Sequence, residues 1–299
     1  MGNITPRLIV ASIALFAATT LALAPAFAEG EGAHWTYEGE AGPTHWGELT
    51  PEFALCGGGK EQSPVDIAAS APVNTAGLAF DYKPTKLNIV NNGHTIQVNY
   101  DPGSGITLDG KRYELVQFHF HQPSEHEIAG GASPMELHLV HKAADGEHTV
   151  VGVMMETGAE STALAPAWAH LPAVEGEPET VAGATLDAAG FLPADRAYYR
   201  YMGSLTTPPC SEGVRWNVLR DAVQVSDAQL AAFKAIIHDN ARPLQAMGAR
   251  QFLSAGQAEP AMPAALPKTG IPGLPLGEVV ASLGLLVAGA GVLRRRTVG

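Results

Sequence analysis

The sequence predicts a single domain dominated by β-sheet with helices at its periphery, a mainly β (α+β) fold. First, its 299 residues are 46% hydrophobic and 16% charged, which supplies enough apolar material for one large core. Second, 33 glycines and 22 prolines favour many short strands separated by turns over a helical bundle. Third, strand-like alternation recurs along the chain, whereas helical spacing is infrequent.

Apolar and polar residues alternate in several segments, each of which predicts a strand. These segments lie at 87–90, 95–100, 115–121, 135–142, 149–155, 198–205 and 214–219. Helical spacing is best at 161–171 and 226–238, and the second segment begins with Ser226-Asp227, a pair typical of a helix N-cap. We therefore expect the strands to form most of the domain.

The chain is acidic, with a formal net charge of −12. Nucleic-acid binding needs a basic face that neutralises phosphates, so this charge argues against a nucleic-acid partner. The charge does not bear on the fold, because net charge affects solubility and partners.

The N-terminal residues have the order of an export signal. Arg7 precedes an apolar run at 8–28, which ends at Ala28 in an Ala-Phe-Ala cleavage pattern. We expect a signal peptide at 1–28 and an exported mature protein. An uncleaved membrane anchor is the alternative.

The C-terminal residues resemble the cell-wall sorting signal that bacterial sortases recognise. An Ala/Pro-rich tether at 254–268 leads into LPKTG at 266–270, an apolar stretch at 279–293 and three arginines. The resemblance implies that 266–299 is a sorting signal, that sortase is a partner, and that the chain is joined to the cell wall after Thr269. A transmembrane helix that stays in the membrane is one alternative, and a periplasmic location is another.

Two cysteines, Cys56 and Cys210, lie in the part of the chain that we expect to be exported. In an oxidising compartment, a single pair is most simply explained as a disulfide. In the chain-entropy description, closing so long a loop stabilises a domain by roughly 5 kcal/mol. Cys210 follows Pro208-Pro209 in SLTTPPCSEG, so the disulfide would hold a rigid turn that can place a hydroxyl group accurately.

Three histidines and a glutamate crowd into QFHFHQPSEH at 117–126. Side chains on a strand alternate between its faces, so Gln117, His119 and His121 share one face and the two phenylalanines the other. An H-x-H pair on a strand is a moderately specific sign of a metal site, and Gln117 could accept the ring N–H of His119. The alternative is two hydrogen-bonded polar residues on an exposed face.

A third ligand is expected on the neighbouring strand, MELHLVHK. Three histidines with an open fourth position are typical of catalytic zinc. Spacing alone leaves His126, His138 and His141 as alternatives for the third ligand. The alternation favours His138, because Glu136 on the same face could accept the N–H of its ring.

Together these segments closely resemble the α-class carbonic anhydrases. The resemblance rests on the motifs HWTYEG, QSPVDI, NNGHTIQV, QFHFHQPSEH, ELHLVHK, SLTTPPCSEG and NARP. It implies a catalytic domain at 29–253 with a large, mostly antiparallel twisted sheet, short peripheral helices and Zn²⁺ in a conical cleft. It also implies a lyase activity, the reversible hydration of carbon dioxide to bicarbonate and a proton.

Matched position by position, the resemblance implies roles for the residues around the metal. The Zn²⁺ ligands would be His119, His121 and His138. Their ring N–H groups would be accepted by Gln117, Glu136 and the backbone carbonyl of Asn240. Thr206 would accept a hydrogen bond from zinc-bound hydroxide and donate its own to Glu125, which orients the hydroxide for attack on carbon dioxide.

Further residues would handle the proton and the substrate. His94 would shuttle the proton to buffer, because histidine titrates near neutral pH. The water leading to it would be ordered by Tyr37, Asn92 and Gln97, although Gln97 stands where many family members have Asn. The substrate pocket would be formed by Val140, Val150, Leu205, Thr206, Thr207, Val214 and Trp216. Cys56 and Cys210 fit the disulfide common in exported members.

Two other functions are compatible with the same fold. A non-catalytic cell-surface binding module would be indicated by loss of one of the three ligands, and all three are present. A zinc esterase is the other alternative, because zinc hydroxide can attack activated esters. The resemblance makes His126 and His141 structural residues that do not contact the metal.

Overall fold

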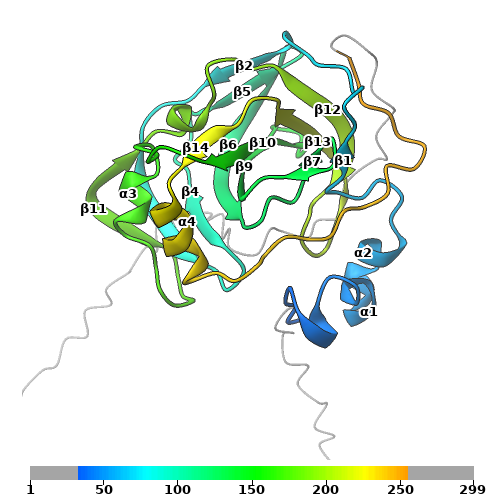
Figure 1. Ribbon diagram of the computed structural model, residues 1–299, viewed down its shortest axis with the longest axis horizontal. Helices are drawn as coiled ribbons and strands as arrows, with labels where there is room; N and C mark the ends of the chain where they lie inside the picture. The colour runs from blue at the N-terminus through cyan, green and yellow to red at the C-terminus, as the bar shows by residue number, and fades with distance from the viewer. Residues whose placement is uncertain (1–32, 255–299) are drawn as a thin grey trace, which may run out of the picture. The chain divides into compact units, whose positions relative to one another are not determined.

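The computed structural model describes residues 33–254, and one large sheet runs through the domain (Figure 1). The strands of this sheet are β2 (Leu78–Asp81), β3 (Thr85–Asn91), β4 (Ile96–Asn99), β5 (Gly105–Leu108), β6 (Lys111–His121), β9 (Met135–Lys142), β10 (His148–Thr157), β11 (Glu179–Leu186), β12 (Tyr198–Ser204), β13 (Glu212–Leu219) and β14 (Val223–Val225). A small separate sheet contains β1 (Asp66–Ile67), β7 (Glu127–Ile128) and β8 (Gly131–Ala132). The expected signal peptide, the sorting signal and all but the first residue of the tether lie outside the described residues.

The strand order of the large sheet is β11-β3-β4-β6-β9-β10-β13-β12. Neighbours in this order are antiparallel except β10 and β13, which run parallel. Off this path, β5 pairs with β6 and with β2, and β14 runs parallel to β10. The mostly antiparallel sheet that the family resemblance implied is therefore confirmed.

Short helices accompany the sheet, as expected. They are α1 (Trp46–Leu49), α2 (Leu55–Gly58), α3 (Ala165–Trp168) and α4 (Asp227–Lys234), with the 3-10 turns η1 (Gly39–Ala41), η2 (Pro51–Phe53) and η3 (Ala188–Phe191). Helix α4 begins where predicted, because the Ser226 side chain accepts the N–H of Gln229 and the Gln229 side chain accepts that of Ser226. Both α3 and α4 are shorter than predicted. Within residues 33–254, no helix has the length and apolar character needed to cross a membrane.

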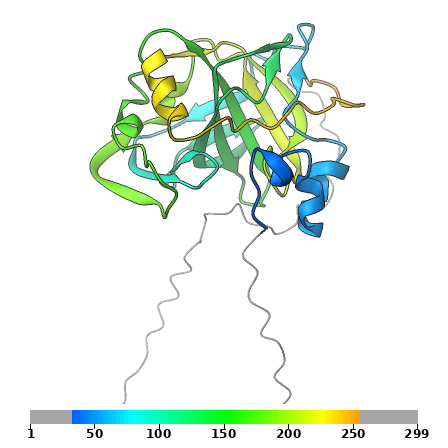
Figure 2. The same ribbon diagram turned by 60° about the horizontal axis from the view of Figure 1, so that its bottom comes forward.

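The two faces of the large sheet carry different side chains. On one face, Phe118 and Phe120 belong to the main apolar core, and the Phe120 ring lies 5.1 Å from that of Trp168 on α3 and 6.0 Å from that of Phe233 on α4. Both ribbon views show α4 on one side of the domain and the α1–α2 segment on the other (Figures 1 and 2). We call the opposite face of the sheet, which carries His119, the histidine face.

Some strands and strand boundaries were not predicted from the sequence, because apolar and polar residues do not alternate regularly there. Strand β11 (ETVAGATL) is mostly exposed, and its pairing with β3 shifts register between Thr180 and Thr185. Strand β6 begins at Lys111, before the predicted start, because residues 111–114 pair with β5. A second register shift, just after Leu115, separates this part of β6 from the part that carries the histidines.

Candidate active site

The strand register brings His119, His121 and His138 together. His119 on β6 lies directly opposite His138 on β9, and His121 follows two residues later on the same face. One ring nitrogen of each histidine lies within 4.8 Å of the others, a spacing that a single metal ion can bridge. The three histidines predicted as ligands therefore surround one point on the histidine face.

Hydrogen bonds orient the two rings of β6. The Nδ1 of His119 donates to Oε1 of Gln117 at 2.8 Å, and the Nδ1 of His121 donates to the backbone carbonyl of Asn240 at 2.8 Å. Each bond fixes both the direction of the ring and its tautomer. The Nε2 atoms of both rings are not used in these bonds and are available to a metal ion.

Glu136 orients His138 and also separates His126 from the metal site. Its Oε1 lies 2.9 Å from Nε2 of His138 and 2.8 Å from Nδ1 of His126. The Nε2 of His126 lies 2.7 Å from the hydroxyl of Tyr201, so both nitrogens of this ring have partners. His126, Glu136 and His138 are close enough to hold an ion, but they form a hydrogen-bonded group instead. The Nδ1 of His138 is not used in these bonds and is available to a metal ion.

The chemistry of the three histidines fits Zn²⁺. The Nε2 of His121 is buried and has no hydrogen-bond partner within the described residues, which calls for a ligand at that atom. Burial lowers the pKa of His119 well below its ordinary value, lowers that of His121 to about 4, and lowers that of His138. The rings are therefore neutral near pH 7, which is the form that coordinates zinc.

His141 lies on the opposite face of β9 from His138. Its Nε2 lies 2.8 Å from the hydroxyl of Tyr82, and the two rings are stacked with centroids 5.9 Å apart. Its position agrees with the strand alternation that favoured His138 over His141. Burial lowers the pKa of His141 to about 3.

This buried ring predicts a loss of stability in acid. Because the folded pKa of about 3 lies below the ordinary value of 6.5, folding disfavours protonation of His141. Its contribution to stability is complete above about pH 6.5 and is lost as the pH falls toward about 3. At about 1.4 kcal/mol per pKa unit, the loss approaches about 4 kcal/mol at the lower end.

Urea unfolding of the zinc-free protein between pH 7 and pH 4 measures this effect. The unfolding free energy of the wild type should fall more steeply with acidification than that of His141→Gln, whose amide can still bond to Tyr82. Equal slopes for the two proteins would show that His141 does not carry the acid sensitivity.

Glu125, in the loop after β6, is a buried carboxylate beside the histidines. Its Oε1 accepts the backbone N–H of Arg242 at 2.8 Å, and its Oε2 lies 3.5 Å from Nε2 of His121. Burial raises the pKa of Glu125 to about 7, against the opposing effects of His138 and of hydrogen bonds from Thr206 and Arg242. The Thr206 hydroxyl is thus paired with a carboxylate that borders the metal site.

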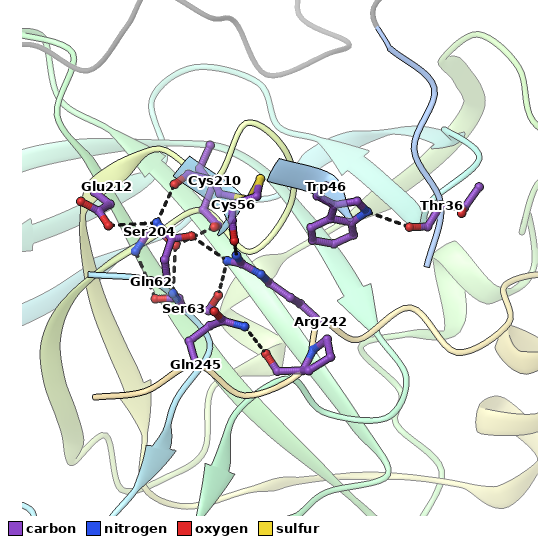
Figure 3. Close-up of a disulfide and its surroundings, with 12 residues drawn as sticks. Thr36, Trp46, Cys56, Gln62, Ser63, Ser204, Cys210, Glu212, Arg242 and Gln245 are labelled. Atoms are coloured by element: carbon purple, nitrogen blue, oxygen red, sulfur yellow. Dashed lines mark hydrogen bonds between the residues drawn. A yellow bond between two sulfur atoms is a disulfide. The ribbon is translucent and has the colours of Figure 1, made fainter. Parts of the chain in front are cut away.

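The loop that carries Thr206 joins β12 to β13 and is held by a disulfide between Cys56 and Cys210 (Figure 3). The N–H of Cys210 donates to the carbonyl of Thr207 at 2.8 Å, which closes the turn around the two prolines. The disulfide predicted from the sequence is confirmed. It ties helix α2, which contains Cys56, to the loop that carries Thr206.

Arg242 connects the same region through its buried guanidinium. Its Nη1 donates to Oε1 of Gln62 at 2.9 Å and to the carbonyl of Ser63 at 2.7 Å (Figure 3). Its Nη2 donates to the carbonyl of Cys56 at 2.8 Å. Because its backbone N–H also holds Glu125, Arg242 links the disulfide to the metal site, a role that the sequence analysis did not assign.

The histidine face has an apolar half and a polar half. In the apolar half, Val140, Val150 and Trp216 lie side by side on β9, β10 and β13. One apolar cluster includes every aliphatic and aromatic residue predicted for the substrate pocket: Val140, Val150, Leu205, Val214 and Trp216. In the polar half, Gln97 on β4 lies opposite His119. The metal site therefore lies at the boundary between the two halves.

Two of the residues predicted for the proton path, His94 and Tyr37, contact Trp35. His94 is in the turn between β3 and β4, and its ring stacks on Trp35 with centroids 3.6 Å apart. The Oδ1 of Asn92 accepts the backbone N–H groups of His94 and Thr95 at 3.0 and 2.9 Å, so this side chain shapes the turn. Tyr37 packs edge-on against Trp35, and burial raises the pKa of its hydroxyl well above the ordinary value.

Comparison with known proteins identifies the family. Residues 41–255 match the family described as eukaryotic-type carbonic anhydrase. The chain belongs to this family. It is 43% identical to a carbonic anhydrase of Nostoc sp. over 227 residues, which cover 74% of this chain and 86% of the relative. It is 45% identical to a carbonic anhydrase of Pectobacterium carotovorum over 218 residues, which cover 73% of this chain and 89% of the relative.

A solved structure of a carbonic anhydrase is also similar. It is the α-carbonic anhydrase from Thermovibrio ammonificans in complex with the inhibitor sulfanilamide, with a TM-score of 0.71 and 44% sequence identity. The match covers 74% of this chain and 99% of that chain. The described domain therefore corresponds to a whole carbonic anhydrase fold.

Gly152 is one position of this carbonic anhydrase site that the sequence analysis missed. It lies on β10 directly opposite His138. A Cβ atom at Gly152 would lie 2.9 Å from Oε1 of Glu136, the atom that holds both His126 and His138. A glycine inside a strand pattern signals close approach of another group, and that signal was present in the segment at 149–155.

Gly152→Ala should therefore weaken zinc binding by roughly 10–100-fold, the usual cost of disturbing the hydrogen-bond partner of a metal-bound histidine. Competition with a chelator of known affinity measures the change. Gly176→Ala is the matched control, because no atom lies within 4 Å of a Cβ built there. Wild-type zinc affinity in both variants would contradict the role of Gly152.

Proposed function

We propose that this protein catalyses the reversible hydration of carbon dioxide to bicarbonate and a proton, with Zn²⁺ held by His119, His121 and His138. The observation that carries the proposal is the convergence of three neutral imidazole nitrogens next to an apolar pocket. Zinc bound there supplies a Lewis acid that lowers the pKa of a coordinated water molecule. The relatives compared above carry this activity in their names.

Thr206 and Glu125 orient the water molecule that attacks carbon dioxide. When Glu125 is ionised, its carboxylate can only accept hydrogen bonds, and the Thr206 hydroxyl then donates a hydrogen bond to it. The oxygen of that hydroxyl is then restricted to accepting a hydrogen bond from the attacking water. This restriction aims a lone pair of the water at the substrate carbon, and the backbone N–H of Thr206 meets a substrate oxygen.

The apolar half of the histidine face holds the substrate. Carbon dioxide is small and uncharged, so it binds to walls that offer no hydrogen bonds to competing water. The residues proposed for this pocket are Val140, Val150, Leu205, Thr206, Thr207, Val214 and Trp216. Bicarbonate is charged and therefore leaves this apolar surface readily once it has formed.

His94 takes up the proton that hydration releases and passes it to buffer. Its turn lies at the start of β4, the strand that carries Gln97 opposite the metal ligand His119. Tyr37, Asn92 and Gln97 order the water between the metal site and His94. The polar half of the face thus serves the proton, and the apolar half serves the substrate.

Stopped-flow measurement of carbon dioxide hydration tests the proposed function. Protein loaded with one zinc ion per chain should be active, should lose activity when stripped with a chelator, and should regain it with added zinc. Sulfanilamide, which is bound in the Thermovibrio structure, should inhibit the reaction. Full zinc occupancy without hydration would refute the proposal.

We also propose that residues 29–253 are exported as the catalytic domain and anchored at the cell surface. The support is the order of the segments: an export signal at 1–28, a tether at 254–268 and an LPKTG sorting signal at 266–299. A disulfide in the domain agrees with an oxidising compartment. Sortase would cut after Thr269 and join the chain to the cell wall.

Mass spectrometry of the mature C-terminus tests this anchoring. Peptides released from purified cell wall should end at Thr269 with a wall fragment attached. Mature chains that continue past Gly270 would exclude sortase cleavage and favour retention in the membrane.

A further inference from the structure

A row of side-chain hydrogen bonds crosses the polar half of the histidine face. The Nε2 of Gln97 donates to Oδ1 of Asn99, and the Nδ2 of Asn99 donates to Oδ1 of Asn88, each at 2.7 Å. The Nδ2 of Asn88 then donates to Oγ1 of Thr180, also at 2.7 Å. We call these four residues the amide ladder.

The strand register produces the amide ladder. Asn99 on β4 lies opposite Asn88 on β3, and Asn88 lies opposite Thr180 on β11. Gln97 is two residues from Asn99 on the same strand and therefore points to the same face. The ladder spans three neighbouring strands and ends at β11, the edge of the sheet (Figure 1).

The inner end of the amide ladder adjoins the metal site. Gln97 lies directly opposite His119, and Asn99 lies opposite Gln117, the residue that orients the His119 ring. Gln97 is buried, whereas Thr180 is exposed. The ladder therefore runs from the neighbourhood of a proposed metal ligand to the protein surface.

The fold itself does not call for amides at these positions. Strands favour β-branched and aromatic residues, and Asn is depleted in them. Here three neighbouring positions carry amides that satisfy one another. Stability alone would favour valine or threonine at these strand positions. Amides that break this strand preference next to a functional site therefore indicate a functional role.

The amide ladder fixes the orientation of the Gln97 side chain. Because Nε2 is tied to Asn99, the carbonyl oxygen on the other side of the carboxamide is directed away from Asn99 and can accept a hydrogen bond from water. His94 lies in the turn of the same β3–β4 hairpin, three residues before Gln97. The oriented acceptor therefore lies on the strand that pairs with the proposed metal ligand His119 and that directly follows the turn of His94.

We propose that Asn99, backed by Asn88 and Thr180, is a positioning residue that holds Gln97 so that Gln97 orders water on the path to His94. A proton leaves the water of the metal site, passes along this ordered water and binds a ring nitrogen of His94, which then releases it to buffer. This inference rests on the proposed hydration of carbon dioxide. It adds residues that act through Gln97 and do not touch the substrate.

Asn99→Val tests the proposal, because valine suits a strand and removes both hydrogen bonds of Asn99. In the proposed mechanism, proton transfer to buffer limits kcat, whereas kcat/KM reports only the hydration step. The zinc-loaded variant should therefore show kcat lowered roughly tenfold with kcat/KM unchanged. Added imidazole, which carries protons around the internal path, should restore kcat.

Two further variants calibrate the effect. Asn88→Val cuts the amide ladder one step farther out and leaves the bond between Gln97 and Asn99, so kcat should fall less. Thr185→Val is the matched control, because Thr185 lies on β11 outside the ladder and pairs with Lys86. This control should have wild-type kcat and kcat/KM.

A second measurement on the zinc-free protein does not depend on activity. In the NMR spectrum of the wild type, the Gln97 side-chain amide protons should exchange slowly with solvent, because one of them donates to Asn99. In Asn99→Val the exchange should be faster, and in Thr185→Val it should be unchanged. Slow exchange in Asn99→Val would overturn the proposal that Asn99 orients Gln97.

The kinetic outcomes separate this inference from the proposed function. If the wild type hydrates carbon dioxide but Asn99→Val has wild-type kcat, the amide ladder has no role in proton transfer. A parallel fall in kcat and kcat/KM that imidazole does not restore would assign Asn99 a purely structural role. If the zinc-loaded wild type is inactive, the proposed function fails together with this inference.

Discussion

His138→Ala is expected to lose zinc and carbon dioxide hydration together. The substitution removes one of the three ring nitrogens that lie within 4.8 Å of one another. It also removes one of the two ring N–H groups that Oε1 of Glu136 accepts in a buried site. The loss of affinity should exceed the roughly 10–100-fold that follows from losing an outer hydrogen-bond partner of a metal-bound histidine.

His141→Gln is the matched control for this experiment. Both histidines are buried on β9, three residues apart, but their side chains lie on opposite faces of the sheet. The zinc content of each protein after dialysis, measured by atomic absorption, and stopped-flow hydration give the two readouts. His141→Gln should keep both its zinc and its hydration activity. If His141→Gln lost zinc and His138→Ala kept it, His141 would be the ligand, and the assignment of His138 from strand alternation would be wrong.

Thr206→Val is expected to keep zinc and lose most of the activity. Valine has nearly the shape of threonine but cannot donate to Glu125 or accept from water, so the attacking water loses its orientation. Removing one such oriented hydrogen-bonding group typically costs roughly 100-fold or more in rate. We expect a loss of that size in kcat/KM at full zinc occupancy.

Thr206→Ser distinguishes the hydroxyl from the rest of the side chain. Serine keeps the hydroxyl, and the disulfide at Cys210 still holds the loop, so most of the activity should return. The zinc content of both variants should equal that of the wild type, because the three proposed ligands are His119, His121 and His138. Wild-type kcat/KM in Thr206→Val would remove Thr206 from the mechanism.

Strand alternation predicted the inner part of the site because a strand's period is fixed by its backbone. Strand β9 has the predicted bounds, and the pairing of β6 with β9 brings His119 and His138 to one face. Gln117 and Glu136 were predicted as partners from the same rule, and both form the expected hydrogen bonds. Local periodicity therefore predicted the site residues that lie on the paired strands β6 and β9.

The outer parts of the site were not predicted from periodicity, because they depend on segments far apart in sequence. The backbone carbonyl of Asn240 accepts the ring N–H of His121, 119 residues away in sequence. Only the family resemblance predicted this hydrogen bond. Arg242 holds Glu125 across 117 residues and was missed. Gly152 and Asn99 were also missed, because their importance lies in which neighbours the register places beside them.

These long-range contacts also bear on how the enzyme matures. Asn240 orients His121 through its carbonyl and ties the turn of His94 to β6 through its side-chain amide, which donates to the carbonyls of His94 and Phe120. Arg242 supplies the N–H that holds Glu125. A chain that emerges from its N-terminus therefore presents His119 and His121 long before it has the residues that align them. High-affinity metal binding is therefore expected only after residues 240–242 have been synthesised and have packed against the histidine face.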